Sequence, residues 1–312
     1  MNAPIIVILG PTASGKTKLA VRWARQLNAE IISADSRQVY KGMDIGTGKD
    51  LSEYNADSQS VKHHLIDIVE AGDDYNVHQY LQDFWQAYHQ INSRQKRVIL
   101  CGGSGMYLQA VLQNFEFTGV PTNAPLRDNL SAKTDDELMD IFKATPSIYS
   151  SKADVSTRKR LVRAIEISVF LQNNPAPVPY QRPEDVSFEV FGIDVLPQTR
   201  RERISLRLHE RLQNGLIEEV QALIKHGVSP EKLIFYGLEY KFITQYLTGE
   251  LDYPTMVTRL ETAIHQFAKR QMTFFRSMER NGVPINWISP TDDYLTLTTS
   301  TSNSSGAKGK IL

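Results

Sequence analysis

The chain has almost no cysteine. Cys101 is the single one among 312 residues, which excludes an internal disulfide and any zinc module built from several cysteines. Long apolar runs are also missing, since no stretch approaches the ~20 residues that a membrane-spanning helix needs. The N-terminal Met-Asn-Ala-Pro lacks the charged segment of a signal peptide. We therefore expect a cytoplasmic protein that does not associate with membranes.

An excess of charge is absent as well. The chain has 35 Lys and Arg residues and 35 Asp and Glu residues, so a protein that holds nucleic acid by bulk positive charge is excluded. A local basic site is still compatible with this balance. Hydrophobic residues make up 41% of the chain and charged residues 22%, as in ordinary globular proteins. The length provides a core for one large domain or two smaller ones.

Short apolar runs alternate with helical patterns in the first third of the chain. This alternation indicates an α/β fold, in which a parallel sheet carries helices on both faces. We predict strands at 5–9, 30–33, 65–69 and 97–101, and helices at 16–27, 77–91 and 106–112.

The rest of the chain changes character twice. Residues 121–186 show helix patterns, with a capping box at Thr134 and Glu137 and Ser156 as the cap of a helix ending near Leu171. We predict later elements as a strand at 188–194, one helix at 198–225, a long helix at 254–281 and a strand at 285–288. The expected domains are an α/β catalytic core at 1–120 and 187–290, a helical insertion at 121–186 and, because its end is rich in Ser, Thr, Gly and Lys, a disordered tail at 291–312.

One motif carries specific chemistry. The run Gly10-Pro11-Thr12-Ala13-Ser14-Gly15-Lys16-Thr17 matches G-x-x-x-x-G-K-[ST], in which backbone N–H groups surround phosphate oxygens. The Lys16 ammonium adds positive charge, and the Thr17 hydroxyl can bind Mg²⁺. A preceding strand and a following helix argue against the alternative, an ordinary glycine-rich turn. The P-loop predicts a polyphosphate ligand without saying which one.

The carboxylate of an ATPase is missing from the expected place. The strand at 97–101 ends in Gly102-Gly103-Ser104, and Asp67 is only a weaker candidate for a carboxylate on the metal side. The sequence therefore favours a loop that holds a polyphosphate as a leaving group over one that hydrolyses it.

Two polar residues follow neighbouring strands. Asp35 comes just after the strand at 30–33, and Ser104 follows the strand at 97–101. The carboxyl ends of strands line the ligand crevice in such sheets, so Asp35 is a candidate general base and Ser104 a candidate substrate ligand. The alternatives are an Asx turn at Asp35 and a helix cap at Ser104.

The order of several motifs resembles that of tRNA dimethylallyltransferases, mostly of the bacterial type. The resemblance extends from about residue 4 to residue 288. It is carried by Gly10–Thr17, Asp35–Thr47, His63–Asp67, Gly102–Tyr107 and Lys269–Arg276.

The resemblance implies transfer of a dimethylallyl group from dimethylallyl diphosphate to N6 of adenosine 37, beside the tRNA anticodon. It implies that Lys16, the loop amides, Arg207 and Mg²⁺ on Thr17 bind the diphosphate. Asp35 matches the family's general base, and Ser104 replaces a Thr at the reacting centre. The implied partners are dimethylallyl diphosphate and a tRNA anticodon stem-loop, and we expect a monomer.

The resemblance also implies residues that contact tRNA. Four positions depart from the family pattern: Glu239 stands for Gly, Ile264-His265 for Thr-Arg and Phe274 for Trp. The implied tRNA contacts are Asp35, Ser36, Arg37, Gln38, Ser104, Arg127, Arg160, Arg163, Tyr240, Lys241, Lys269, Arg270, Gln271 and Arg276.

Two other activities remain open. An adenylate isopentenyltransferase would act on free AMP, ADP or ATP, but that branch varies the P-loop as Ala-Thr-Gly-x-Gly-Lys-Ser. A small-molecule kinase would use ATP on the same loop, and it would need lid arginines that no motif supplies.

Overall fold

A parallel sheet forms the centre of the fold. The computed structural model describes residues 3–55, 60–174 and 182–296, and within them six strands pair in the order β3-β2-β4-β1-β5-β6. All neighbouring strands run parallel, which confirms the predicted fold class. The strands are β1 (Ile5–Leu9), β2 (Ala29–Ala34), β3 (His63–His64), β4 (Arg97–Gly102), β5 (Phe188–Ile193) and β6 (Asn286–Ile288).

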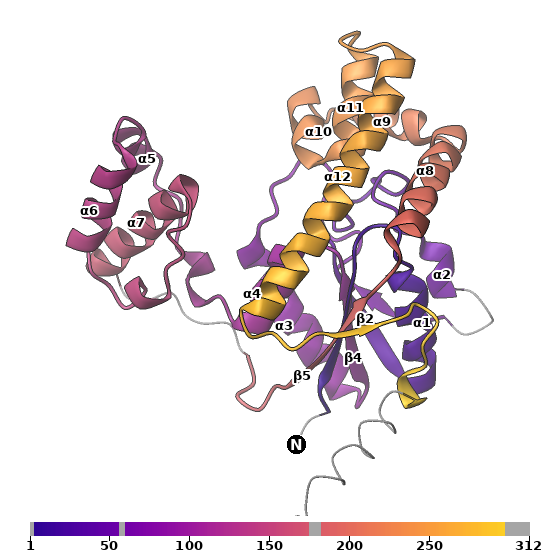
Figure 1. The fold of residues 1–312 in the computed structure, drawn as a ribbon, viewed down its shortest axis with the longest axis horizontal. Helices are drawn as coiled ribbons and strands as arrows, with labels where there is room; N and C mark the ends of the chain where they lie inside the picture. Colours follow the sequence, from indigo (N-terminus) through magenta and orange to yellow (C-terminus); the bar gives the residue numbers. More distant parts are fainter. Residues whose placement is uncertain (1–2, 56–59, 175–181, 297–312) are drawn as a thin grey trace, which may run out of the picture. The chain divides into compact units, whose positions relative to one another are not determined.

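The chain divides into two compact units, Met1–Gln113 with Pro183–Leu312, and Asn114–Arg182; the predicted insertion spans 121–186. The helices of the first unit are α1 (Lys16–Leu27), α2 (Leu51–Asn55), α3 (Val77–Ser93), α4 (Gly105–Gln113), α8 (Pro197–Gln213), α9 (Leu216–Lys225), α10 (Pro230–Tyr236), α11 (Leu238–Leu247) and α12 (Tyr253–Arg280). Figure 1 shows α1 on one side of the sheet and α3 and α4 on the other. Most elements predicted for this unit are confirmed to within two residues.

One face of the sheet packs against α1. Alternate strand residues such as Ile6 and Ile8 belong to this face, and both are fully buried. The Trp23 ring of α1 packs edge-on against Phe191 and Tyr294, with ring centroids 5.1 and 5.3 Å away. Such edge-to-face pairs add to the free energy gained by burying the rings.

The predicted disordered tail begins too early. Tyr294 is buried, and its hydroxyl donates a 2.7 Å hydrogen bond to Glu189 Oε2, so residues 291–296 are anchored to the folded unit by this side chain. Burying one large aromatic side chain stabilises by about 2–3 kcal/mol, which is enough to hold a short polar segment. Residues 297–312, with the Ser- and Thr-rich stretch, lie outside the described residues.

The strand predicted at 65–69 is wrong. β3 stops at His64, because Leu65 and Asp67 have φ values of 60° and 56°, which a strand does not tolerate. Asp67 instead forms an ion pair with the buried Lys49. The weaker candidate for a carboxylate on the metal side is therefore already paired with a cation.

The single helix predicted at 198–225 is two helices. Gly215 separates α8 from α9 with φ of 99°, a left-handed conformation that glycine adopts without strain. The break redirects the chain, while Ile204 of α8 and Val220 of α9 stay in one buried cluster.

The long helix α12 is amphipathic. It spans 28 residues, and its buried side chains recur at the three- and four-residue spacing of one helix face. The buried residues of α12 are Met256, Leu260, Ile264, Ala268, Gln271, Phe275 and Met278.

In the described part of the chain, no helix is long and apolar enough to cross a membrane.

The second unit is helical and has its own core. Its helices are α5 (Ala124–Ser131), α6 (Asp135–Ala144) and α7 (Arg158–Asn173). The 3₁₀ turn η1 (Glu116–Gly119) precedes α5, and η2 (Ser150–Lys152) lies between α6 and α7. Around Leu138 and Ile165, both fully buried, the helices close a small apolar cluster.

The caps in this unit follow the sequence with one shift. The predicted capping box is confirmed: Glu137 Oε2 accepts the N–H of Thr134 at 2.7 Å, and Thr134 Oγ1 accepts the N–H of Glu137 at 3.3 Å. The cap of α7 is Thr157 rather than Ser156, because the N–H of Ser156 donates to Asp154 Oδ1 in a preceding turn.

Candidate active site

The P-loop joins β1 to α1 at the carboxyl end of the sheet. Residues 10–15 leave β1, and α1 begins at Lys16, so the loop amides lie at a helix N-terminus, where an anion is favoured. Ala13 and Gly15 have φ values of 60° and 85°. Backbone turns of this kind form a concave group of N–H donors for an anion. The structure therefore brings the predicted phosphate-binding residues 10–17 together.

Two residues from the C-terminal half of the chain fasten this loop. Gln271 Oε1 accepts the N–H of Thr12 at 2.9 Å, and Gln271 Nε2 donates to the carbonyl of Gly103 at 2.9 Å. The Arg207 guanidinium donates from Nη2 to the Thr12 hydroxyl. Gln271 was predicted to contact tRNA, and here both ends of its amide hold the protein backbone.

Asp35 and Ser104 follow two adjacent strands. Asp35 Oδ1 accepts the N–H groups of Arg37 at 2.9 Å and Gln38 at 3.4 Å, so the Asx turn is present, and both bonds use the same carboxylate oxygen. Ser104 Oγ accepts the N–H of Ser36 at 2.9 Å and donates to Ser36 Oγ at 3.2 Å. The backbone next to the two predicted catalytic residues is thus fixed by hydrogen bonds from their own side chains.

These side chains line a pocket of about 310 Å³ that lies within the first unit. This volume is at the small end of the range for small-molecule sites. Its lining is Thr12, Lys16, Thr17, Asp35, Ser36, Arg37, Gln38, Gly46, Thr47, Gly48, Asp50, Ser104, Arg207, Arg211, Tyr236, Gly237, Leu238, Glu239, Tyr240, Ile264, Phe267 and Gln271.

Part of this lining was not predicted from the sequence. The lining residues that were not predicted as site residues are Gly46, Thr47, Gly48, Asp50, Arg211, Tyr236, Gly237, Leu238, Glu239, Ile264 and Phe267. The signal for Arg211 was its four-residue spacing from Arg207, which places both on one helix face.

Positive charge is concentrated and buried in the pocket. Burial lowers the pKa of Lys16, and neighbouring groups that include Asp35 act in the opposite direction. Burial and the neighbouring Arg211 lower the pKa of Arg207 to about 10, so this guanidinium is still charged at neutral pH. Burial raises the pKa of Glu239 against the attraction of Arg211. Such a site is electrostatically prepared for an anion.

The loop at 44–46 is fixed by Glu219. Its Oε2 accepts the N–H groups of Asp44 at 2.8 Å and Ile45 at 2.6 Å, and its Oε1 accepts the N–H of Gly46 at 3.0 Å. The buried Tyr240 hydroxyl also donates to Glu219 Oε1 at 2.8 Å. Tyr240, a predicted tRNA contact, therefore lies in the pocket wall and supports this loop.

The donors for a metal ion are few. Thr17 lies in the pocket together with Asp35 and Asp50, whereas no group of three or more His, Cys, Asp or Glu side chains in the described residues could hold a metal. A hydroxyl with oxygen ligands from a phosphate suits Mg²⁺, which keeps several waters and binds few protein groups. The residues present therefore fit a Mg²⁺ ion that arrives with a polyphosphate.

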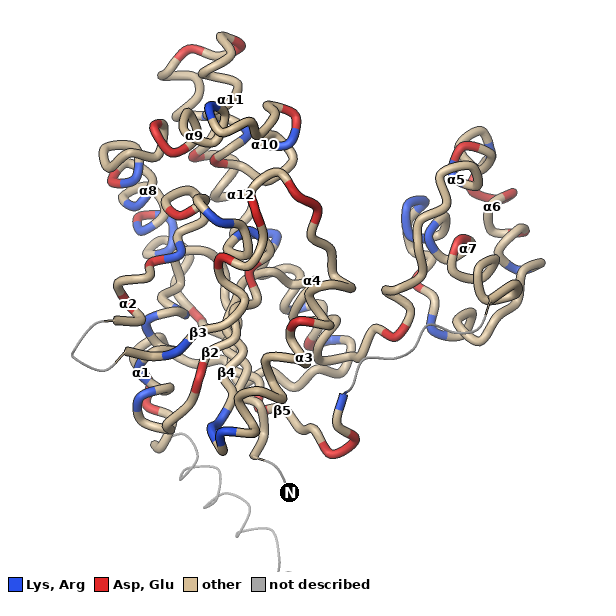
Figure 2. Tube along the Cα trace, turned by 180° about the vertical axis from the view of Figure 1, so that it is seen from behind, with Lys and Arg blue, Asp and Glu red and all other residues tan. Residues whose placement is uncertain are grey.

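The remaining predicted tRNA contacts of the first unit lie outside the pocket. Lys269, Arg270 and Arg276 are exposed on α12, and the Lys241 ammonium lies 5.6 Å from the centroid of the Phe242 ring. Figure 2 marks these and the other basic positions in blue.

The arginines of the second unit that were predicted to contact tRNA form ion pairs with carboxylates of the same unit. Arg127 binds the fully buried Glu166 through Nε and Nη2, both at 2.8 Å, and Arg163 Nη1 lies 3.3 Å from the same carboxylate. Arg160 pairs with Asp154 at 2.6 Å on the surface. Arg127 thus joins α5 to α7, whereas Arg163 joins α7 to the carbonyls of Val120 and Pro121 before α5.

The departures from the family pattern lie in different surroundings. Ile264 and Glu239 line the pocket. His265 is partly buried near Glu261 at 3.8 Å. Phe274 packs against Gly105, where a Cβ would lie 2.3 Å from the ring.

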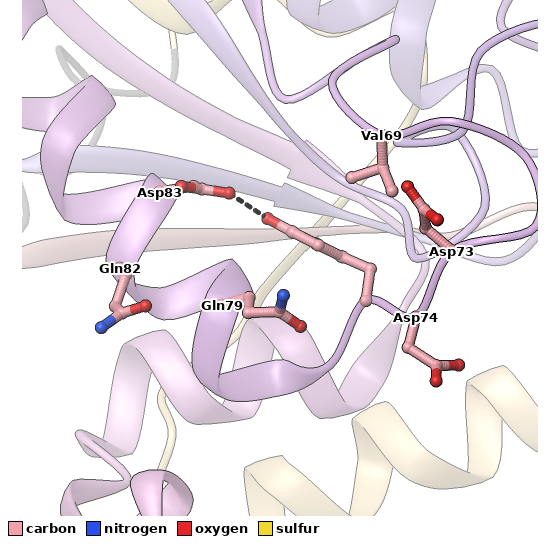
Figure 3. Close-up of a pocket in the computed structure, with 7 residues that line it drawn as sticks. Val69, Asp73, Asp74, Gln79, Gln82 and Asp83 are labelled. Carbon is pink, nitrogen blue, oxygen red and sulfur yellow. Dashed lines mark hydrogen bonds between the residues drawn. The ribbon is translucent and has the colours of Figure 1, made fainter.

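A second hollow of about 590 Å³ is more open and has the opposite charge. Figure 3 shows Asp73, Asp74 and Asp83 around it, with the Tyr75 hydroxyl bound to Asp83 Oδ2 at 2.7 Å. Carboxylates repel phosphates, and Asp74 already pairs with Lys232 at 2.5 Å. The pocket at the P-loop is therefore the candidate active site.

Comparison with known sequences agrees with this geometry. Residues 38–278 match the IPP transferase family. The chain belongs to this family. A tRNA dimethylallyltransferase of Porphyromonas gingivalis is 53% identical over 284 residues, which cover 91% of this chain and 93% of that protein. One of Parabacteroides distasonis is 50% identical over 287 residues, with 92% of each chain covered.

Solved structures are similar as well. The full-length tRNA isopentenylpyrophosphate transferase of Bacillus halodurans is 28% identical, with a TM-score of 0.67 over 98% of this chain and 96% of that one. A eukaryotic dimethylallyltransferase acting on tRNA shares the fold, with a TM-score of 0.71 over 99% of this chain and 81% of that one at 22% identity.

Proposed function

We propose that the chain transfers the dimethylallyl group of dimethylallyl diphosphate to N6 of adenosine 37 of tRNA, beside the anticodon, and releases diphosphate. The observation that carries the proposal is the pocket itself: a buried cationic P-loop faces Asp35, while β4 ends in Gly102-Gly103-Ser104 without a carboxylate. This combination is better suited to a reaction in which diphosphate is the leaving group than to one in which a phosphoryl group is transferred.

The leaving group sets the first requirement. As the C1–O bond of the allyl diphosphate breaks, positive charge develops on the allyl carbon and negative charge on the departing oxygens. Lys16, Arg207 and the loop amides donate to these oxygens, and donors fixed in a buried site lower such a barrier strongly. The Thr17 hydroxyl would hold Mg²⁺, which would supply further positive charge to the leaving group.

The nucleophile sets the second requirement. The N6 lone pair of adenine is delocalised into the ring, so the amine attacks C1 poorly unless its proton is removed. Asp35 accepts this proton as the N6–C1 bond forms and the C1–O bond breaks. Ser104 follows the neighbouring strand, and its hydroxyl hydrogen-bonds at the reacting centre in place of its bond to Ser36 Oγ.

The RNA has to deliver an unstacked base. A pocket of this size admits one base taken out of the anticodon loop, and the rest of the stem-loop has to lie on the outer surface. Exposed cations such as Lys269, Arg270 and Arg276 suit the phosphates of that RNA. We infer that a monomer binds one anticodon stem-loop.

The deciding experiment incubates the purified chain and Mg²⁺ with dimethylallyl diphosphate and one acceptor: unmodified tRNA, AMP or ATP. Nucleosides are then analysed by mass spectrometry. We expect N6-dimethylallyladenosine in tRNA, at a single position that RNase mapping assigns to residue 37.

Each other outcome identifies a different activity. Product in AMP alone would replace the proposal with an adenylate isopentenyltransferase. ATP turnover without any prenyl product would replace it with a kinase. A matched anticodon stem-loop with guanosine at position 37 serves as the control and should stay unmodified.

A further inference from the structure

Arg211 is a second guanidinium in the active-site wall. It lies four residues after Arg207 on α8, and both side chains line the same pocket. Its side chain is 12% exposed. The sequence motifs assign a role to Arg207 and none to Arg211.

The hydrogen-bonding capacity of Arg211 is largely unused. Its Nη2 is buried and has no hydrogen-bond partner in the described part of the chain. The nearest carboxylate, Glu239, lies 4.0 Å from Nη1, which is beyond hydrogen-bond distance. A guanidinium has five N–H donors, and leaving buried donors unpaired costs free energy. Arg211 is therefore ready to bind an acceptor that enters the pocket.

The surroundings of Arg211 keep its position fixed. Nη2 lies against Gly48, where a Cβ would come within 1.8 Å of it. Glu239 of α11 lies 4.0 Å from Nη1 and attracts it. The guanidinium is therefore held between Gly48 and Glu239, and all three residues line the pocket.

The charges of the pocket define the acceptor. Its cations are Lys16, Arg37, Arg207 and Arg211, and its carboxylates are Asp35, Asp50 and Glu239. Burial lowers the pKa of Arg207, and repulsion from Arg211 lowers it further. A multiply charged anion between the two guanidinium groups relieves this repulsion and accepts their free donors.

We propose that Arg211 is a second diphosphate ligand beside Arg207, and that Glu239 is the counter-charge that weakens this binding. The inference rests on the proposed function, because it takes dimethylallyl diphosphate as the anionic substrate. Arg211 then binds the diphosphate in substrate and product, so it acts on affinity more than on the chemical step.

The test measures binding of inorganic diphosphate with Mg²⁺ by calorimetry, together with steady-state kinetics. We expect Arg211→Met to weaken diphosphate binding about tenfold and to raise KM for dimethylallyl diphosphate similarly, with kcat changed less and KM for tRNA unchanged. Glu239→Gln should tighten diphosphate binding several-fold. Arg203→Met, an exposed arginine of α8 outside the pocket lining, is the matched control and should leave diphosphate affinity unchanged.

A purely structural role gives a different result. If Arg211 only pairs with Glu239, both variants lower Tm and neither changes diphosphate affinity, which would overturn the inference. Arg211→Lys keeps the charge with fewer donors, so it covers the case in which Arg211→Met does not fold, and it should bind diphosphate with intermediate affinity. A wild-type chain that modifies tRNA while Arg211→Met binds diphosphate normally contradicts this inference alone, whereas a wild-type chain that binds no diphosphate contradicts the proposed function too.

Discussion

Asp35 holds its own loop: Oδ1 accepts the backbone N–H of Arg37 at 2.9 Å. An asparagine in its place keeps a carbonyl oxygen for this Asx turn and loses only the basic oxygen. Asp35→Asn is therefore a clean test of the general base, because the backbone around the site should be preserved.

We expect Asp35→Asn to bind diphosphate normally and to lose a factor of about 10²–10⁴ in kcat, the usual contribution of general acid–base catalysis. Single-turnover kinetics with saturating tRNA measures this loss. Asp83→Asn changes a carboxylate of the other hollow and should keep the wild-type rate. A wild-type rate in Asp35→Asn would remove Asp35 as the base.

Gln271→Ala should damage both stability and diphosphate binding. It leaves the N–H of Thr12 and the carbonyl of Gly103 without their partner, and unsatisfied buried groups cost about 1–3 kcal/mol. The P-loop also loses its connection to α12. Urea unfolding and diphosphate titration measure the two effects.

The control for that prediction is Gln109→Ala. Gln109 Nε2 donates a 2.9 Å hydrogen bond to Gln113 Oε1 on the surface of α4. The substitution should therefore change the free energy of unfolding of the protein by no more than about 0.5 kcal/mol. Equal losses in the two variants would contradict the role given to Gln271.

Glu166→Gln should destabilise the second unit, since it removes the buried charge that Arg127 and Arg163 share. We expect a loss of about 1–3 kcal/mol. Glu116→Gln, in the exposed pair with Lys152, should cost no more than about 1 kcal/mol. Urea unfolding of the full chain, followed by circular dichroism, provides both values.

The same variant makes a pH prediction. Burial raises the pKa of Glu166, but hydrogen bonds from Arg127 and Asn123 outweigh it, so the net pKa is lowered from 4.5. A lowered pKa stabilises the folded state above pH 4.5 and loses this contribution as the pH falls through the folded value. The stability gap between wild type and Glu166→Gln should therefore be constant near neutral pH and close in acid. A gap that widened in acid would contradict the assigned direction.

Arg276→Ala should weaken tRNA binding without touching the diphosphate site. Its exposed guanidinium on α12 is proposed to contact a phosphate, so its loss should lower the salt dependence of tRNA binding by about one unit of slope. Fluorescence anisotropy of labelled tRNA at several salt concentrations measures this. Arg259→Ala, exposed on the same helix, should keep the wild-type slope.

Secondary structure could be predicted from the sequence wherever neighbouring residues alone determine it. The P-loop, the strand before it and the helix after it are determined by glycine positions and by local apolar spacing, so they could be predicted. The strand expected at 65–69 failed because its apolar run hides two residues with positive φ, and Asp67 is fixed by the distant Lys49. Tertiary contacts of this kind are not visible in a window of neighbours.

The motif residues of the site could be predicted from the sequence, whereas the placement of Arg211 and Glu239 in the pocket could not. Asp35, Ser104, Lys16 and Arg207 meet in one pocket, which the motif order implied. The approach of Arg211 to Glu239 at 4.0 Å depends on how α8 packs beside α11. Only the fold brings these two charges together.

The bond from Gln271 to Thr12 also sets the time at which a nascent chain gains its site. The two residues are 259 positions apart, and a ribosome adds about 5–20 residues per second. The P-loop therefore leaves the ribosome tens of seconds before the helix that fastens it. During that interval the chain has a phosphate-binding sequence but no finished pocket, because Ile264, Phe267 and Gln271 of its last long helix complete the lining.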